Sequence, residues 1–329
     1  MSRTAEHAVS FTAVETAELV EVPREETPLG PTEVAGRTLT SLISPGTELA
    51  GYRSDPFPRM TGYAAVFRVD KVGRDVRAVH PSDRVFCMGP HRSFQRADEA
   101  DVTPLPTGLA PETAVFARLM GVSMTTLATT TARPPARVVV TGLGPVGYLA
   151  AQIFAACGYE VLACDPVAAR RGVARAAGIG RVTAAPPLDD PLWAGQTALV
   201  VECSGHEQAV VDGCHLVQKR GEVVLVGVPW QRRTALTAHD VLHAVFHRYV
   251  VLRSGWEWEL PLRPTEFHNG SIWGHMAAAL RWLADGRIHV ESAYRVMSPR
   301  DCQAAYQALA HGPGTDLTIM FDWGRLADG

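Results

Sequence analysis

A short glycine-rich stretch constrains the fold of this chain more than any other feature. Residues 142–147 read Gly-Leu-Gly-Pro-Val-Gly, directly after an apolar strand-like run and at the start of a predicted helix. In that setting Gly142 permits a tight turn, Gly144 lets the backbone approach a pyrophosphate, and Gly147 lets the helix pack closely on the strand. The phosphates would face the positive end of the helix dipole. The predicted dinucleotide contacts are Gly142, Gly144, Pro145, Val146 and Gly147. The alternative is a glycine-rich turn that binds nothing.

Strands and helices alternate around this motif. Strands are predicted at 137–141, 160–164, 198–203, 222–228 and 249–253, and helices at 145–157, 168–177 and 207–218. Such alternation is typical of a parallel sheet with helices on both faces. We therefore predict an α/β fold whose residues 116–256 form a Rossmann-type, doubly wound parallel sheet.

An acidic residue stands at the end of the second strand of this region. Asp165 could accept hydrogen bonds from the adenosine ribose hydroxyls and would repel a 2′-phosphate, so we expect NAD(H) rather than NADP(H). Arg170 and Arg171 weaken that preference because an arginine here can hold a 2′-phosphate. Two later strand-end turns are further candidate cofactor contacts, or ordinary turns, and they contain Ser204, Gly205, Gly227 and Val228.

The regions on either side of residues 116–256 have a different pattern of predicted secondary structure. Residues 1–115 contain short β-type runs at 8–13, 17–22, 37–43, 64–72 and 83–88, separated by turns rich in Gly and Pro. This pattern predicts a β-rich, barrel-like unit. Residues 257–329 contain predicted helices at 274–284 and 299–310 and a final strand at 317–321, which we expect to return to one of the sheets.

Composition excludes several classes of protein. The net charge is −3 without a basic block, so nucleic acid is not an expected partner. Apolar runs stop short of the ~18–20 residues of a membrane span, and no secretory signal is visible, so we expect no membrane association. The six cysteines form no C-x-x-C pair and are expected as free thiols of a cytoplasmic protein.

The order of these parts resembles the medium-chain dehydrogenase/reductase superfamily over nearly the whole chain. The resemblance is carried by Ser-Pro-Gly-Thr-Glu at 44–48, Gly-Tyr-Ala at 62–64, Asp-Arg-Val at 83–85, the glycine motif with Asp165, and residues 280–288. It implies an NAD(P)-dependent enzyme with a GroES-like catalytic domain formed by 1–115 and 257–329, and a homodimer joined near 249–255. Within the superfamily the chain is most similar to the alcohol-dehydrogenase-like branch, near the bacteriochlorophyllide dehydrogenase subgroup.

The chain departs from the zinc-containing members at their metal ligands. Where those members have a Cys, a His, and a Cys or acid, this chain has Pro45, Tyr63 and a position near Met120. None of these side chains is a normal zinc ligand. The segment 87–91 carries one cysteine where many relatives have a four-cysteine structural lobe. The resemblance therefore implies a zinc-independent enzyme, although Glu48 and His91 could recruit a metal in another geometry.

Without zinc, a hydrogen-bond donor must stabilise the charge that develops on the reacting oxygen. We expect Tyr63 to be this donor, Thr47 a proton relay and Glu48 an orienting base. His91 is expected to approach the substrate or the nicotinamide. The structural alternative for Tyr63 is an aromatic ring that only fills the space that zinc occupies in relatives. The alternative for Thr47 is a side chain that caps a turn. The remaining alternatives are a structural ion pair for Glu48, for example with Arg53, and a surface turn for His91.

Three functional hypotheses follow from these residues. The first is a zinc-independent, NAD(P)-linked oxidoreductase acting on the carbonyl or alcohol of a small organic molecule, which could be a specialised metabolite. The second keeps the cofactor but reduces an activated C=C or C=N bond. The third is a dinucleotide-binding protein without catalysis. Trp256 and Trp258 could line the substrate pocket, or pack in the core or at a dimer interface.

Overall fold

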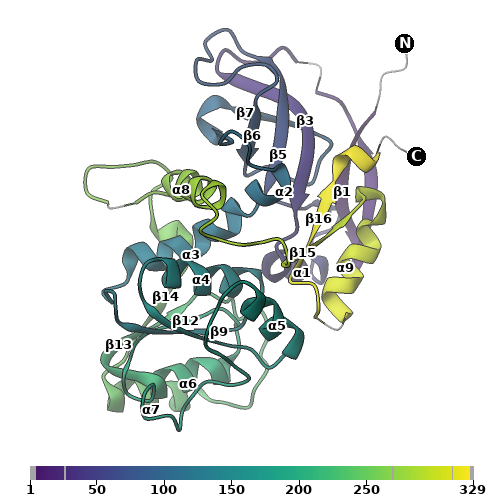
Figure 1. The fold of residues 1–329 in the computed structure, drawn as a ribbon. Coiled ribbons are helices and arrows are strands. Elements are labelled where there is room, and N and C mark those ends of the chain that lie inside the picture. Colours follow the sequence, from purple (N-terminus) through teal and green to yellow (C-terminus); the bar gives the residue numbers. More distant parts are fainter. Residues whose placement is uncertain (1–4, 26, 269, 313, 327–329) are drawn as a thin grey trace. The chain divides into compact units, whose positions relative to one another are not determined.

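The computed structural model describes residues 5–25, 27–268, 270–312 and 314–326. The chain divides into two compact units, each of which is described by itself (Figure 1). The first unit comprises the described residues of Met1–Arg118, Leu280–Asp285 and Tyr294–Gly329. The second comprises those of Leu119–Ala279 and Gly286–Ala293. Residues 257–279 thus group with the second unit, and the division into 1–115, 116–256 and 257–329 remains a proposal about domain ends.

A parallel sheet forms the centre of the second unit. Its strands are β9 (Arg137–Thr141), β10 (Glu160–Cys164), β11 (Val182–Thr183), β12 (Thr197–Glu202), β13 (Val217–Leu225) and β14 (Val251–Ser254). They lie in the order β11-β10-β9-β12-β13-β14, and every pair is parallel. Val138, Val139 and Val140 are fully buried, as a central strand covered on both faces requires. The predicted doubly wound fold is confirmed.

Helices cover both faces of this sheet, namely α4 (Pro145–Ala156), α5 (Ala168–Ala176), α6 (Glu207–Leu216) and α7 (Ala238–Arg248). Most of α3 (Ala117–Thr129) and α8 (Ile272–Ala284) also belongs to this unit. In Figure 1, α4 and α5 lie on one side of the strands and α6 and α7 on the other. Cys214 of α6 and Ala244 of α7 pack in one apolar cluster with Val139 of β9 and Val223 of β13. Neither α3 nor α7 was predicted from the sequence.

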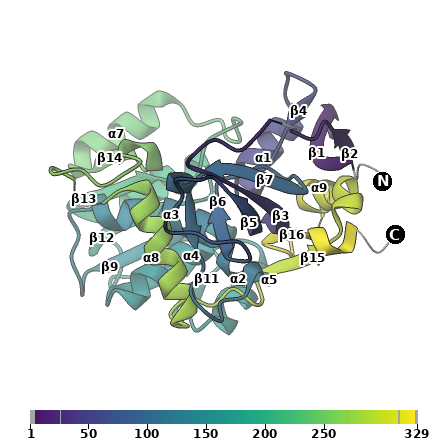
Figure 2. The same cartoon turned by 90° about the horizontal axis from the view of Figure 1, so that it is seen from above.

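Two sheets build the first unit, and their strands pair antiparallel except for the parallel pair β15 and β16. One has the order β2-β1-β4, with β1 (Glu6–Ala13), β2 (Thr16–Val22) and β4 (Arg59–Met60). The other has the order β15-β16-β3-β5-β6-β8, and β7 also pairs with β3. Its strands are β3 (Glu33–Leu42), β5 (Ala65–Val72), β6 (Arg84–Cys87), β7 (Phe94–Asp98), β8 (Val102–Pro104), β15 (Tyr294–Met297) and β16 (Thr318–Asp322). Figure 2 shows β3, β5 and β6 side by side.

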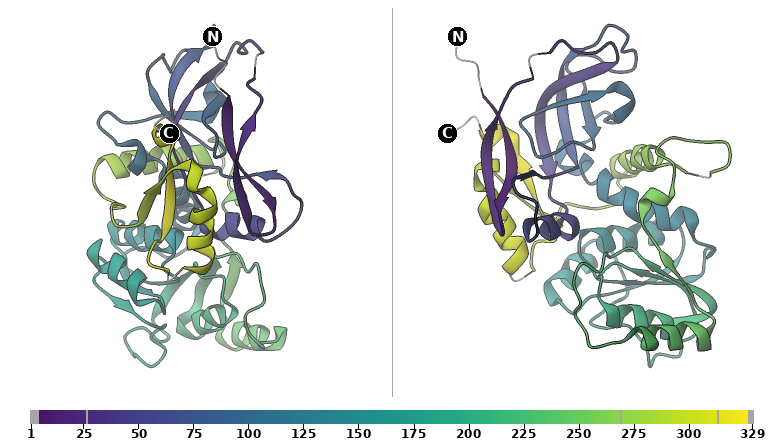
Figure 3. Two further views of the ribbon diagram at one scale, coloured as in Figure 1. Left: turned by 90° about the vertical axis from the view of Figure 1, so that its right-hand side faces the viewer. Right: turned by 180° about the vertical axis from the view of Figure 1, so that it is seen from behind.

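The C-terminal segment completes the first unit, as the sequence predicts. Phe321 of β16 lies opposite Ser41 of β3 in an antiparallel pair. Figure 3 shows from two sides that the yellow helix α9 (Cys302–His311) lies beside the purple strands β1 and β2. The remaining helices are α1 (Pro45–Tyr52), α2 (Pro111–Ala114) and the short η1 (Glu99–Asp101), η2 (Glu257–Glu259), η3 (Pro299–Asp301) and η4 (Trp323–Leu326). Across the described ranges, no helix combines the length and apolarity needed to cross a membrane.

Helix α1 was not predicted, and it positions the candidate catalytic segment. It begins at Pro45, where proline's fixed φ suits the first turn of a helix. The helix carries Tyr52 into an aromatic cluster with Phe11 and Tyr306. Burial of these rings fixes the helix, and with it the side chains of residues 44–48.

Candidate active site

The glycine motif forms a tight turn between β9 and α4. Gly142 has φ +81°, and a Cβ atom there would lie 2.8 Å from the Cα of Ser204. A Cβ atom on Gly147 would lie only 1.8 Å from the carbonyl oxygen of Gly142. Both positions therefore require glycine for the backbone to close as it does. Gly144 differs because a Cβ atom there would meet nothing within 4 Å.

This open space fits a dinucleotide. Gly144 is the N-cap residue of α4, and no side chain caps the helix. Val146 and Gly147 lie in the first turn of α4, where backbone N–H groups have no partner within the helix. These N–H groups can donate hydrogen bonds to an anion at the positive end of the helix dipole. The three glycines therefore separate into two that the fold requires and one that leaves room for a ligand backbone or phosphate.

Asp165 lies at the end of β10 and supports the glycine turn. Its carboxylate accepts hydrogen bonds from the N–H of Leu143 at 2.7 Å and from the N–H of Val167 at 2.7 Å. Arg170 lies 3.6 Å from the same carboxylate, and Arg171 donates to the Asp165 carbonyl at 2.8 Å. The aspartate side chain is almost fully buried. Besides any ribose contact, Asp165 thus holds the loop on which the pyrophosphate would rest.

The turns after β12 and β13 meet the glycine turn. A Cβ atom on Gly205 would lie 2.5 Å from the Val228 carbonyl oxygen, and one on Gly227 would lie 2.4 Å from the Gly205 nitrogen. Because Gly142 also touches Ser204, the predicted cofactor residues of three strand ends come together. Parallel strands place their carboxyl ends at one edge, where such sheets bind ligands.

Glu202 anchors these turns, although the sequence analysis did not assign it a role. Its carboxylate accepts hydrogen bonds from the N–H of Ser204 at 2.7 Å and of Gly205 at 3.1 Å. The Thr141 hydroxyl donates to it at 3.3 Å. Burial raises the pKa of this carboxyl despite these donors. A buried acid at a strand end, two residues before a Ser-Gly turn, is the signal that could have identified it.

In the first unit, Tyr63 is half-buried beside the start of α1. Burial raises the pKa of its phenol, while the Arg118 charge and hydrogen bonds from Ser44 and Thr47 act to lower it. The structure thus brings Tyr63 together with Thr47, the predicted relay residue, and Thr47 is exposed. A phenol with two hydroxyl neighbours can donate a proton and have it replaced.

Arg118, at the start of α3, is a neighbour of Tyr63 that the sequence analysis missed. Its guanidinium carbon lies 4.7 Å from the centroid of the Tyr63 ring, and its side chain is buried. The resemblance pointed to Met120 at this place, but α3 brings the residue two positions earlier to the tyrosine. The available signal was an arginine two positions before Met120, inside an otherwise apolar stretch.

Glu48 and His91 are brought together, but in a buried network. The Glu48 carboxylate accepts hydrogen bonds from the Ser44 N–H at 2.7 Å, the Thr61 hydroxyl at 2.8 Å and the Tyr306 hydroxyl at 2.6 Å. Nε2 of His91 lies 3.0 Å from the same carboxylate. Burial raises the pKa of Glu48, but the charge and hydrogen bond of His91 and the other donors outweigh it, and the net pKa is lowered.

Glu48 does form a structural ion pair, but with His91, so Arg53 as its partner is wrong, and so is a surface turn for His91. Arg53 pairs with Glu15 at 3.0 Å rather than with Glu48. His91 is fully buried, with Nδ1 2.7 Å from the Ser41 hydroxyl, so it is not a surface-turn residue. Because both nitrogens of the imidazole have protein partners, we now propose that His91 supports Glu48 and α1 rather than contacting a substrate.

The residues of the first unit do not fit a catalytic zinc ion. Among the described residues, no three His, Cys, Asp or Glu side chains gather as a metal site. Glu48 and His91 already satisfy each other, and Tyr63 and Arg118 occupy the neighbouring space. A tyrosine under a guanidinium offers no thiolate, imidazole or carboxylate to zinc.

The predicted substrate-pocket tryptophans lie in the second unit. Trp256, just before η2, is 67 % exposed, and Trp258, within η2, is 46 % exposed. Packing in the core, one of the alternatives for these residues, is therefore wrong. A role toward a substrate or toward a second copy of the chain stays a prediction.

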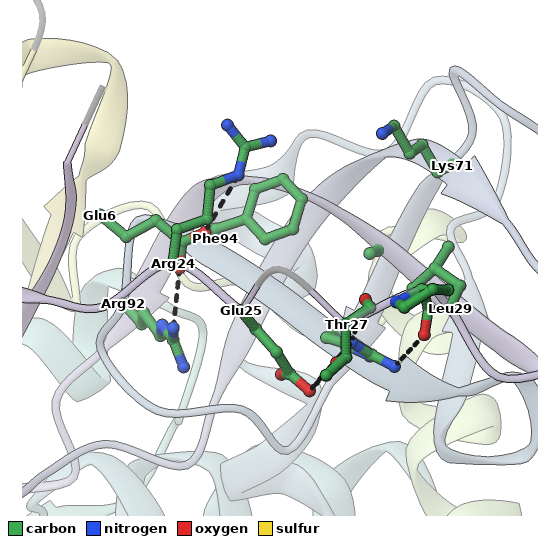
Figure 4. A pocket seen from close by; sticks show the side chains of 11 residues that line it. Glu6, Arg24, Glu25, Thr27, Leu29, Lys71, Arg92 and Phe94 are labelled. Atoms are coloured by element: carbon green, nitrogen blue, oxygen red, sulfur yellow. Dashed lines mark hydrogen bonds and ion pairs between the residues drawn. The ribbon is translucent and has the colours of Figure 1, made fainter. Parts of the chain in front are cut away.

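A separate hollow of about 380 Å³ lies within the first unit (Figure 4). Its charges are largely balanced by ion pairs. Glu6 faces Arg92 at 2.7 Å and Arg24 at 3.9 Å, and Arg96 pairs with Glu25 at 2.9 Å. None of the site residues predicted above lines this hollow.

Known proteins are similar to this chain in the sequence of its parallel-sheet region and in its overall fold. Residues 145–256 match the family model described as zinc-binding dehydrogenase. Galactitol-1-phosphate dehydrogenase from Escherichia coli is similar in fold, with a TM-score of 0.81 and 18 % identity over 96 % of this chain and 99 % of that one. A putative zinc-binding dehydrogenase from Sinorhizobium meliloti, solved with NADP, gives a TM-score of 0.78 and 17 % identity over 97 % and 100 %.

A third similar structure is acetophenone reductase from Geotrichum candidum in complex with NAD. Its TM-score is 0.77, and the identity is 16 % over 98 % of each chain. At these identities the likeness shows the fold, while the family model identifies the nucleotide-binding part. Residues 145–256 are therefore similar to zinc-binding dehydrogenases, and the chain as a whole shares the fold of these solved dehydrogenases and reductases.

Proposed function

We propose that this enzyme transfers hydride between a nicotinamide and the carbonyl or alcohol group of a small organic substrate without using zinc. The observation that carries the proposal is the half-buried Tyr63 phenol, whose ring lies 4.7 Å from the Arg118 guanidinium carbon and whose pKa the neighbouring Ser44 and Thr47 side chains act to lower. The resemblance places Tyr63 where zinc-containing relatives have a histidine. Relatives of similar fold that include a galactitol-1-phosphate dehydrogenase and an acetophenone reductase support a carbonyl or alcohol substrate.

The chain's own residues account for the proton. When bound, the nicotinamide supplies or accepts the hydride at the substrate carbon. In the reductive direction Tyr63 gives its phenolic proton to the substrate oxygen, which becomes a hydroxyl group, and the phenol becomes a tyrosinate. The Ser44 and Thr47 hydroxyls stabilise the tyrosinate, and the exposed Thr47 relays a proton back from water. Oxidation of an alcohol reverses each of these steps.

We propose that NAD(H) is preferred over NADP(H). The buried Asp165 carboxylate would repel a 2′-phosphate, and Arg170 is already directed to that carboxylate at 3.6 Å. Arg171 is engaged with the backbone carbonyls of Asp165 and Pro166. Titration of the protein with NADH and NADPH, followed by nicotinamide fluorescence, tests this preference. Tighter binding of NADPH would overturn it.

We further propose a cytoplasmic homodimer. All six cysteines are free thiols, which suits a reducing compartment. Strand β14 forms an edge of the parallel sheet, and Tyr249 and Val251 at this edge are 65 % and 44 % exposed. An edge strand with exposed apolar side chains favours pairing with another chain, here a second copy.

The test combines metal content and reactivity. Zinc per chain is measured by elemental mass spectrometry on the purified protein, and NADH oxidation is followed with matched ketone, enone and imine substrates. We expect near-zero zinc and turnover of the ketone. About one zinc per chain would contradict the metal-free proposal. Exclusive loss of the alkene or imine would favour C=C or C=N reduction, and tight NADH binding without any turnover would favour a non-catalytic protein.

A further inference from the structure

Tyr63 and Arg118 form a stacked pair in the first unit. The guanidinium carbon lies 4.7 Å from the ring centroid, within the range of a cation–π interaction. Arg118 is only 4 % exposed. An arginine keeps its proton even when buried, so a permanent positive charge faces the tyrosine ring.

A buried cation needs a compensating interaction, because removing a charge from water is costly. The electron-rich face of the Tyr63 ring supplies part of it, and a tyrosinate would supply more. The pair is therefore more stable when the phenol carries negative charge. That charge develops when the phenol donates its proton to a substrate.

We propose that Arg118 is a positioning residue that acts through Tyr63 and provides the positive charge that a metal ion provides in zinc-dependent relatives. This inference rests on the proposed function, because it assigns Tyr63 as the proton donor. The cation and the donor are then separate groups: Arg118 holds the charge and Tyr63 touches the reacting oxygen.

The other groups around Tyr63 do not replace this charge. From α1, Ser44 and Thr47 present hydroxyl groups, which stabilise a tyrosinate through hydrogen bonds. The Glu48 carboxylate, also on α1, acts in the opposite direction and raises the pKa of Tyr63. Nε2 of His91 lies 3.0 Å from the Glu48 carboxylate, and His91 is not among the groups that most shift the pKa of Tyr63. Of the charged groups that influence Tyr63 within the described residues, Arg118 is the cation.

The test measures the ionisation of Tyr63 itself and needs no substrate. Tyrosines are replaced biosynthetically by 3-fluorotyrosine, whose more acidic phenol titrates below alkaline denaturation. The tyrosinate absorbance is followed as the pH is raised, in the full-length protein and in its Tyr63→Phe variant. The same pair of titrations is carried out with Arg118→Met and with the Arg118→Met/Tyr63→Phe double variant. Subtracting the second curve of each pair from the first leaves the ionisation of the tyrosine at position 63. We expect the midpoint to rise by about one pH unit when the arginine is removed.

Arg118→Lys is the matched control, because it keeps the charge and should retain a midpoint near that of the unchanged protein. If Arg118→Met does not fold, Arg118→Gln, which is uncharged and polar, takes its place in the same comparison. Equal midpoints with and without the charge would overturn the inference. That result is separate from the proposed function, which fails instead if Tyr63→Phe keeps full activity on the identified substrate.

Discussion

Nε2 of His91 lies 3.0 Å from Oε2 of Glu48, and both side chains are buried. The same carboxylate accepts hydrogen bonds from Tyr306 of α9 and Thr61 before β5. One acid thus joins α1, the segment that carries His91 and the C-terminal helix. Its lowered pKa makes this network a source of pH-dependent stability.

Replacing Glu48 by Gln is expected to destabilise the protein by about 3 kcal/mol at neutral pH, since buried donors lose a charged acceptor. The pKa of Glu48 is lowered in the folded state, so its ionised form stabilises the fold. This contribution to the free energy of unfolding is fully present above the unfolded-state pKa. It is lost as the pH falls through the folded-state value. Urea unfolding from pH 7 to pH 3 should therefore show the difference between variant and parent shrinking with acid. Glu18→Gln, at an exposed position, should show no such difference.

Replacing Tyr63 by Phe removes the proposed proton donor while keeping the ring beneath Arg118. We expect kcat to fall by about 10²–10³-fold, the range for loss of one general acid or oxyanion donor. NADH binding and the melting temperature should change little. Steady-state kinetics with the ketone identified above checks this, and unchanged kcat would remove Tyr63 from the mechanism.

The glycine motif allows a paired test of cofactor binding and folding. Gly144→Ala places a methyl group in open space, so stability should change by no more than about 0.5 kcal/mol. NADH affinity should fall at least about tenfold, because the methyl group occupies the path of the pyrophosphate. Gly147→Ala places its methyl group 1.8 Å from the Gly142 oxygen and should cost about 2–3 kcal/mol of stability. Calorimetry of NADH binding and thermal unfolding separate the two effects. Equal NADH affinity in Gly144→Ala and the parent would mean that the phosphates lie elsewhere.

A charge on the edge strand should disrupt the proposed dimer. Val251→Lys puts an ammonium group on β14, where it is expected to shift the protein to monomers in light scattering coupled to size exclusion. Leu188→Lys, at a similarly exposed apolar residue away from β14, is the control and should leave the mass unchanged. A monomeric parent protein would itself contradict the proposal.

Much of the second unit could be predicted from sequence because its signals are local. The strands at 137–141 and 160–164 were predicted at their observed bounds, since each is a continuous run between turn residues. The glycine motif likewise contains within six residues the features that its turn requires. Ser204 and Gly227 were predicted to face the same site because parallel strand ends meet at one edge, and both lie in turns that come together there.

The catalytic half of the site depends on contacts between distant residues, and sequence patterns do not report these. Glu48 and Tyr63 are close in sequence, yet Glu48 bonds to His91 and Tyr306 instead. Arg118 reaches Tyr63 only because α3 begins at residue 117, a helix that the sequence analysis missed. The pairing of Tyr63 with Arg118, from which the metal-free proposal is argued, becomes visible only when both side chains are seen together.

Strand β16 lies at residues 318–322 and pairs with β3, at residues 33–42. During synthesis on the ribosome, all strands of the parallel sheet, which ends at residue 254, emerge before β16 exists. The nucleotide-binding unit can therefore fold while the chain is still growing, whereas the unit that holds Tyr63 and Arg118 waits for its last strand. The parallel sheet with the glycine turn is thus made first, and the unit that holds the proposed proton donor is completed last.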